Sequence, residues 1–172
     1  MKKKYINYYM SIADLTSKLS YAKKLQVGAV IVKENQILAT GYNGTPSGWD
    51  NNCEEKIWDQ GSGGWLSAEE MISTYPHVGW NELTECEVRY KLKTKPEVLH
   101  AEMNALMAVT KSTESSMGAS LFCTHSPCIE CAKLIYQAGI KSLYYRDQYR
   151  DDSGITFLKQ GDISVHQYTL PD

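Results

Sequence analysis

Two short motifs constrain this chain more than any other feature of its sequence. The first is His100-x-Glu102 and the second is Pro127-Cys128-x-x-Cys131. Together they offer one imidazole and two thiols, and three protein ligands are typical of a catalytic zinc, which keeps its fourth tetrahedral position open. If Cys128 and Cys131 lie on a helix, both sulfurs point from one face, because residues three apart are neighbours there. The motifs therefore predict one metal centre.

Glu102 suggests that this metal centre is catalytic. Water bound to a metal has its pKa lowered to about 7, but a nearby carboxylate must still accept and deliver protons. A closed structural zinc has no use for such an acid beside its ligand. We expect His100 at a helix start and Pro127 in the first turn of a second helix, where a proline gives up no needed N–H. The positive end of that second helix favours thiolates.

Composition and charge narrow the range of functions. The 172 residues are 42% hydrophobic and 22% charged, which is ordinary for a single globular domain with a sizeable core. The net charge of -2 argues against a polynucleotide substrate but leaves room for a small anion. No apolar run approaches the roughly 18 residues of a membrane span, and no apolar signal-peptide core follows the basic start. We therefore expect a cytoplasmic protein without nucleic-acid or membrane partners.

Cysteine usage agrees with that compartment. The chain has five cysteines, so they cannot all pair, and two of them belong to the predicted metal motif. A reducing environment is the simpler interpretation.

Hydrophobic periodicity predicts alternating helices and strands over most of the chain. The predicted helices cover residues 6–19, 100–111, 127–138 and 152–159, and the predicted strands cover residues 27–32, 37–42, 119–124, 142–146 and 164–169. The first two strands are expected to form a β-hairpin. The alternation predicts an α/β sandwich with helices on both faces of a mixed sheet.

Residues 43–97 interrupt the alternation, and we expect them to be an insert within one domain that spans residues 1–172. A structureless loop of this length is uncommon, so the insert is expected to have short elements of its own. Ser67 is a suitable cap for a helix at 67–74, and a second helix is predicted at 82–92. The tryptophans of the insert either pack it onto the body or form a nucleotide or subunit surface. They are Trp49, Trp58, Trp65 and Trp80.

The two motifs are the known signature of zinc nucleobase deaminases. The chain resembles the cytidine deaminase superfamily, and within it the deoxycytidylate (dCMP) deaminases of phage type. The resemblance runs through VGAVIV (27–32), GYNGTPSG (41–48), HAEMNA (100–105) and SPCIEC (126–131) to Tyr149. It implies a three-layer α-β-α sandwich with a mixed five-stranded sheet. It also implies zinc-dependent hydrolytic deamination of dCMP to dUMP with ammonia release, which supplies dUMP for dTMP synthesis.

The resemblance further implies roles for individual residues. Zn²⁺ is held by His100, Cys128 and Cys131, and Glu102 is the catalytic acid and base. The implied substrate-binding residues are Asn43, Ala101, Asn104, Ser126 and Tyr149. The asparagine at 43 resembles one that holds the sugar hydroxyl, and the backbone at 101 and 126 faces the base edge. The asparagine at 104 reaches the substrate phosphate or caps local backbone, and the tyrosine at 149 contacts substrate or is structural.

Regulation is also implied only by the resemblance. It suggests a homohexamer that is activated by dCTP with Mg²⁺ and inhibited by dTTP. The glycine-rich loop could cradle phosphate through its backbone N–H groups. The implied effector residues are Asn43, Gly44, Gly48, Trp49, Asp50 and Asn52. A second, structural zinc occurs in some phage relatives, but Cys53 and Cys86 alone do not predict one here.

Two other interpretations share the metal motifs. A deaminase of a nucleoside, a base or a tRNA adenosine needs no pocket for a 5′-phosphate, and a tRNA enzyme should show steep salt dependence. A non-catalytic, zinc-stabilised interaction module predicts that Glu102→Gln leaves every function intact.

Overall fold

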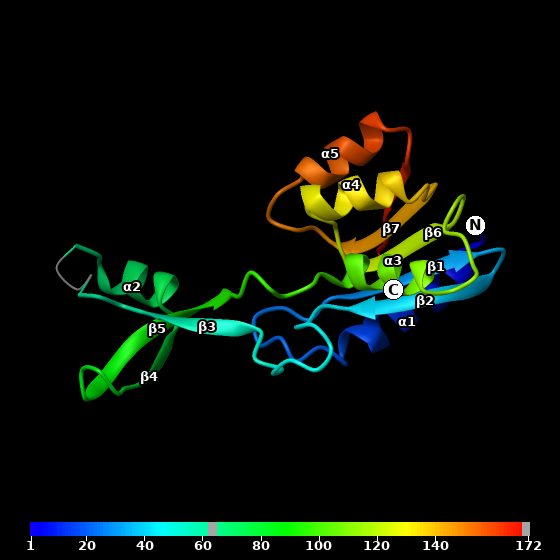
Figure 1. The fold of residues 1–172 in the computed structure, drawn as a ribbon. Coiled ribbons are helices and arrows are strands. Elements are labelled where there is room, and N and C mark those ends of the chain that lie inside the picture. The colour runs from blue at the N-terminus through cyan, green and yellow to red at the C-terminus, as the bar shows by residue number, and fades with distance from the viewer. Residues whose placement is uncertain (62–64, 170–172) are drawn as a thin grey trace.

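The computed structural model describes residues 1–61 and 65–169 and contains two separate β-sheets (Figure 1). The helices are α1 (Lys3–Ser17), α2 (Ala68–Thr74), α3 (Ala101–Thr110), α4 (Ile129–Gln137) and α5 (Ser153–Gln160). The strands are β1 (Gly28–Lys33), β2 (Gln36–Tyr42), β3 (Glu54–Trp58), β4 (His77–Asn81), β5 (Cys86–Thr94), β6 (Ser120–His125), β7 (Ser142–Asp147) and β8 (Ser164–Gln167).

The larger sheet is mixed and has the strand order β2-β1-β6-β7-β8. Strand β1 is antiparallel to β2 and to β6, whereas β6, β7 and β8 run parallel. The continuous apolar run of β1 is buried on both faces of the sheet, as its sequence predicts. Ala29 and Ile31 join one core cluster, and Val30 and Val32 join the other.

Helices cover both faces of this sheet (Figure 1). Helix α1 packs Tyr9 and Met10 against Phe122 and Tyr144 on one face. The other face is covered by α3, α4 and α5, which contribute residues such as Leu106, Ile135 and Leu158 to the larger cluster. The predicted three-layer α-β-α sandwich with a mixed five-stranded sheet is confirmed.

The start of the second metal helix differs from the prediction. Helix α4 begins at Ile129, and Cys128 is its extended N-cap with φ -69° and ψ 169°. Pro127 therefore precedes the helix, and its predicted place in the first turn is wrong. The extended backbone at Cys128 directs its sulfur toward His100, while its carbonyl accepts the first helical bond from the N–H of Ala132 at 2.9 Å.

The predicted helix at 82–92 is also wrong, because strand β5 occupies most of this range. Its residues alternate between charged and apolar types from Glu87 to Lys93, which is the two-residue period of a strand. Strand β5 pairs with both β3 and β4. The predicted helix at 67–74 is confirmed as α2, where Ser67 and Glu70 form a reciprocal capping box.

We call residues 54–94 the arm, because β3, β5, β4 and α2 extend away from the rest of the chain, which we call the body (Figure 1). At its root, Lys95 donates its N–H to the carbonyl of Cys53 at 3.0 Å. Cys53 is buried there against Ala22 and Val98. The arm is thus anchored to the body by a short, closely packed junction.

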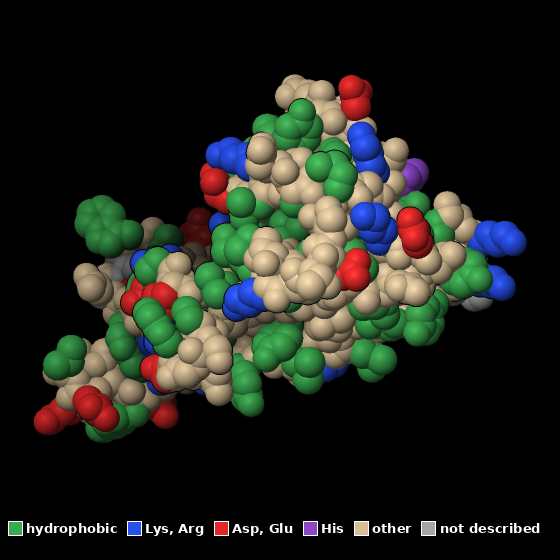
Figure 2. All heavy atoms as spheres, turned by 45° about the vertical axis from the view of Figure 1, so that its right-hand side comes forward, with side chains coloured by type: hydrophobic (Ala, Val, Ile, Leu, Met, Phe, Trp, Pro, Cys, Tyr) green, Lys and Arg blue, Asp and Glu red, His purple; other side chains and the backbone are tan. Residues whose placement is uncertain are grey.

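The tryptophans do not bury their rings between arm and body. Trp49 and Trp80 are each 60% exposed, and Trp65 is 91% exposed. Trp58 packs edge-on against Tyr90 within the arm, with 5.1 Å between ring centroids. Figure 2 shows apolar side chains standing out from the arm at the left of the view.

Within the part of the chain that the structure describes, no helix has both the length and the apolar character needed to cross a bilayer.

Candidate metal centre and substrate pocket

The three predicted ligands meet where two helices begin. His100 is the N-cap of α3, Cys128 is the N-cap of α4, and Cys131 lies in the first turn of α4. Their ligand atoms all lie within 4.8 Å of one another. Across residues 1–61 and 65–169, no other group of three potential ligands is assembled in this way, so Cys53 and Cys86 form no second metal site there.

The donor set fits zinc in both spacing and chemistry. The Nδ1 atom of His100 lies 3.5 Å from the sulfur of Cys128 and 3.3 Å from that of Cys131. A tetrahedron with zinc–nitrogen bonds of about 2.0 Å and zinc–sulfur bonds of about 2.3 Å has nitrogen–sulfur edges of roughly 3.5 Å. The observed distances are close to that value.

The electrostatics of the site also favour a cation. Hydrogen bonds from Cys131 and His100 lower the pKa of Cys128 to about 3. The same contact with Cys128, together with burial, raises the pKa of Cys131. A divalent cation between the two sulfurs favours the thiolate form of both. The N-terminal ends of the two helices add partial positive charge at the same place.

Glu102 is the acid beside the three predicted ligands, and it lies in the first turn of α3. Its side chain is only 4% exposed. Burial raises the pKa of Glu102, while its own N–H and the imidazole of His100 oppose that shift. A carboxyl group held this way can exchange a proton with a molecule bound beside the three ligands.

Two glycines allow other elements to pack directly against the ligand segments. A Cβ on Gly41 would overlap the backbone of Ala101 and Ala105, where β2 crosses the start of α3. A Cβ on Gly154 would overlap the carbonyl of Pro127, where α5 meets the loop before α4. These close approaches hold the two ligand segments on a rigid scaffold.

A pocket opens beside the predicted metal centre, and we call it the substrate pocket. It brings together the ligands His100 and Cys128, the acid Glu102, and four of the five predicted substrate residues. Its lining consists of Ala22, Leu25, Val27, Asn43, Glu54, Thr94, Val98, His100, Ala101, Glu102, His125, Ser126, Cys128 and Tyr149.

Asn104 is the predicted substrate residue that the fold places elsewhere. Its Nδ2 donates to the carbonyl of Tyr42 at 2.8 Å. Its side chain lines a second pocket rather than the substrate pocket. This backbone contact is not the local cap that was one of its two predicted roles, because Tyr42 lies 62 residues away in the sequence.

Asn43 and Ser126 line the substrate pocket but are already engaged with the backbone. Asn43 accepts from the N–H of Val27 at 2.8 Å and donates to the carbonyl of Leu25 at 2.9 Å. The Ser126 N–H donates to the carbonyl of Asp147 at 2.9 Å, and its hydroxyl oxygen accepts from the N–H of Tyr149 at 2.7 Å. The base-edge contact expected from the Ser126 backbone is therefore limited to its carbonyl.

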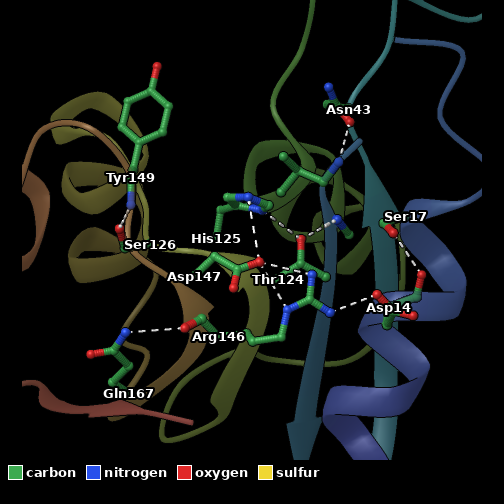
Figure 3. A network of polar contacts seen from close by, with 12 residues as sticks. Asp14, Ser17, Asn43, Thr124, His125, Ser126, Arg146, Asp147, Tyr149 and Gln167 are labelled. Carbon is green, nitrogen blue, oxygen red and sulfur yellow. Dashed lines mark hydrogen bonds and ion pairs between the residues drawn. The ribbon is translucent and has the colours of Figure 1, made fainter. Parts of the chain in front are cut away.

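A polar network connects the pocket to helix α1 (Figure 3). Arg146 donates to Asp14 at 2.7 Å and to Asp147 at 3.0 Å. The Asp147 carboxylate lies 3.7 Å from Nε2 of His125, and the other ring nitrogen contacts Thr124 at 3.2 Å. Burial lowers the pKa of His125, with Arg146 adding to the shift and Asp147 opposing it. The network holds the imidazole of His125 at the wall of the pocket.

Sequence reasoning assigned no role to His125 or Glu54, although both line the substrate pocket. His125 lies beside the metal motif, which was its only sequence signal. Glu54 had no signal, because its hydrogen-bond partners lie about 30 residues earlier, at Lys23 and Lys24.

The predicted effector residues are divided between two places. Gly44 and Gly48 line the second pocket with Asn104, whereas Asn43 lines the substrate pocket. The remaining predicted effector residues lie outside the second pocket's lining, and they are Trp49, Asp50 and Asn52. The N–H of Asn52 donates to the Asp50 carboxylate at 2.9 Å, which stabilises the turn between them.

Comparison with known proteins agrees with this site. The family model for the cytidine and deoxycytidylate deaminase zinc-binding region matches residues 3–146. The dCMP deaminase of cyanophage S-TIM5, solved in complex with dCMP and dUMP, superposes with a TM-score of 0.74 at 39% identity. That alignment covers 98% of this chain and 99% of the cyanophage chain.

Several curated relatives carry the name deoxycytidylate deaminase, among them a yeast and a phage enzyme. The enzyme of Schizosaccharomyces pombe is 34% identical over 167 residues, which are 96% of this chain but only 44% of the yeast protein. The enzyme of Enterobacteria phage T4 is 34% identical over 154 residues, covering 81% of this chain and 76% of the phage protein. Together with the match over residues 3–146, these similarities show that the chain belongs to the cytidine and deoxycytidylate deaminase family.

Proposed function

We propose that the chain catalyses the zinc-dependent hydrolysis of dCMP to dUMP and ammonia. The observation that carries this proposal is a buried acid, Glu102, placed beside three converging ligands at one end of a pocket. The similarity to a cyanophage enzyme solved with dCMP and dUMP supports the choice of substrate.

In this proposal His100, Cys128 and Cys131 hold the zinc. The bound ion would supply Lewis acidity that lowers the pKa of water. Glu102 accepts a proton from the attacking water and delivers it to N3 as the oxygen bonds to C4. It then accepts the proton of the new C4 hydroxyl and delivers it to the amine, which leaves as ammonia while the C4 carbonyl forms. One carboxylate thus acts first as base and then as acid. The carbonyl of Ser126 and the backbone of Ala101 face the base edge.

Basic residues near the pocket favour a nucleotide over a nucleoside. Arg150 lies over the ring of Tyr149, with 5.4 Å between its guanidinium carbon and the ring centroid. Lys23 and Lys24 lie between Ala22 and Leu25, which line the pocket. Cations near a pocket attract and position a phosphate group.

The direct test is ammonia release from dCMP, deoxycytidine and dCTP, with Glu102→Gln as the blank. We expect dCMP to be turned over most efficiently, with a kcat/KM about 10² times that of deoxycytidine. Deoxycytidine has no phosphate, so the groups that contact the phosphate of dCMP would lack a partner. Release from none of the three above the blank would contradict the proposal. A tRNA substrate would then be the next to examine, and its binding should weaken steeply as the salt concentration rises.

We also propose allosteric control by dCTP with Mg²⁺ as activator and dTTP as inhibitor, through the second pocket. Gly44 in that pocket pairs with Leu99 through two backbone hydrogen bonds of 3.1 and 2.9 Å. Leu99 directly precedes the ligand His100, and Asn43 of the substrate pocket directly precedes Gly44. A nucleotide bound there would therefore act on segments of both sites. Activity measured with each effector tests this, and identical dCMP saturation curves with and without effectors would contradict it.

Homohexamer formation is part of the same proposal, with residues 43–97, which include the arm, as an insert of a single deaminase domain spanning residues 1–172. The exposed apolar side chains of the arm, Val78, Trp80 and Leu83 among them, support a subunit surface there. The double variant Trp80→Ser, Leu83→Ser should lower the mass measured by light scattering, and an unchanged hexamer would exclude this surface.

The proposed place of this activity is the cytoplasm, or the host cytoplasm if a phage encodes the chain. There the dUMP product would be available for dTMP synthesis.

A further inference from the structure

Glu54 is a buried acid outside the metal centre that nothing so far accounts for. It is the first residue of β3, at the root of the arm, and only 4% of it is exposed. Its Oε1 accepts from the N–H groups of Lys23 at 3.0 Å and Lys24 at 3.1 Å, and its Oε2 accepts from Lys23 at 3.2 Å. One carboxylate thus satisfies two successive backbone donors of the body.

Those two donors belong to the loop of residues 22–27, which forms one wall of the substrate pocket through Ala22, Leu25 and Val27. The loop lies outside helices and strands, and side chains hold much of its backbone. Asn43 fixes its second half through Leu25 and Val27. Glu54 fixes its first half.

Glu54 also connects this wall to the arm. In the β3–β5 register it is paired with Thr94, and both residues line the substrate pocket. Beside them, Cys53 packs against Ala22 and Val98. Any displacement at the root of the arm would therefore move the loop and the pocket together.

We infer that Glu54 is a positioning residue that fixes the wall of the substrate pocket by tying the loop of residues 22–27 to the root of the arm. Hydrogen bonds to an ionised acceptor are stronger than neutral ones, and buried backbone N–H groups need a partner. Without this acceptor the loop samples other conformations, and substrate binding must then select the ordered one at a cost in affinity.

The variant Glu54→Gln tests this role with little change in side-chain size. The amide oxygen can take the place of Oε1, but the NH₂ group then replaces Oε2 and faces the N–H of Lys23. We expect the KM for dCMP to rise about tenfold, as for loss of one charged hydrogen bond. The kcat should stay within about twofold, because Glu54 does not touch the reacting atoms. Glu54→Ala should raise KM further.

Glu55 provides the matched control, because it is the next residue and points to the surface. It pairs with Lys93 at 3.0 Å, and its side chain is 43% exposed. Glu55→Gln should leave both KM and kcat unchanged. A fall in kcat with unchanged KM in Glu54→Gln would overturn the inference, because it would place Glu54 in the chemistry.

Hydrogen exchange gives a readout independent of activity. In Glu54→Gln the amides of Lys23 and Lys24 should exchange at least about tenfold faster, while those of α3 keep their protection. Unchanged exchange at these two amides would overturn the inference. The kinetic part rests on the proposed function. If the wild-type chain releases no ammonia from dCMP, that function fails. The exchange result still supports or overturns the role of Glu54 in holding the loop of residues 22–27.

Discussion

The body and the arm are stabilised in different ways. The body buries two apolar clusters, one on each face of its sheet. In the described residues of the arm, the only buried side chains are the polar Glu54 and Asn81, and helix α2 buries none. Backbone pairing and local contacts hold the arm, including Lys56 over the rings of Trp58 and Tyr90 at 5.0 and 4.7 Å.

This difference shows where stability resides and where the proposed subunit surface lies. Burial of apolar surface is the main source of folding free energy, and a small sheet without a core is marginal in water. The body can therefore hold a chemical site rigidly, whereas the arm keeps its apolar side chains available to a partner. The junction at Glu54 is where one region acts on the other.

The largest expected difference between the two regions is in turnover. Glu102→Gln in the body should lower kcat at least about 10³-fold, because general acid–base catalysis contributes on that order. The same change on the exposed surface of the arm, Glu87→Gln, should leave kcat unchanged. Cys131→Ser should also abolish turnover but lose zinc as well, which metal analysis measures. Zinc loss in Glu102→Gln would show that its effect is indirect.

The next largest expected difference between the body and the arm is in the free energy of unfolding. Ile135→Ala removes a fully buried side chain from the larger core cluster and should lower the free energy of unfolding by about 2–5 kcal/mol. Leu83→Ala, at a position that is 93% exposed in the arm, should change it by less than about 0.5 kcal/mol. Urea titration measures both. Equal costs would mean that a partner buries the arm under the conditions used.

A smaller effect is expected inside the arm. Ser67→Ala removes the hydroxyl that accepts from the N–H of Glu70 at 3.2 Å, so helix α2 should lose about 1 kcal/mol. Because α2 has no buried residue, this loss should appear as faster local hydrogen exchange rather than as a lower melting temperature. A clear fall in the melting temperature of the whole chain would contradict this separation.

The smallest expected effect concerns pH and the body's polar network. Burial lowers the pKa of His125, so below the ordinary histidine pKa of about 6.5 the unfolded chain binds a proton that the folded chain excludes. The free energy of unfolding should therefore fall between about pH 7 and about pH 5, and it should fall less in His125→Gln. Unfolding curves of the two proteins at both pH values test this, and parallel losses would contradict it.

Local patterns in the sequence predicted most of the body and failed in part of the arm. The helices and strands of the body follow from periodicity, and the cap at Ser67 follows from residue type. The residues of β5 were expected to be helical, although their charged–apolar alternation is a strand signal. Strand β5 is only partly covered on its small sheet. It therefore has charged residues at every second position and no continuous apolar run of the kind seen in β1.

The sequence by itself determined the group of side chains that can perform chemistry here. The spacing is short-range within each pair, His100–Glu102 and Cys128–Cys131, and each pair lies at one helix start, whereas the packing of the two helix starts brings the pairs together. Residues so close along the chain stay neighbours whatever the rest of the fold does. Family membership followed from the same local motifs.

Only the tertiary structure decided how the pocket around that group is closed. Asn104 turns to Tyr42, the N–H of Ser126 is taken by Asp147, and Glu54 holds a loop about 30 residues earlier in the chain. These contacts depend on which elements pack together and on which backbone donors remain unpaired after packing. A backbone donor has no signature in residue type, so its partner becomes visible only when the chain is folded.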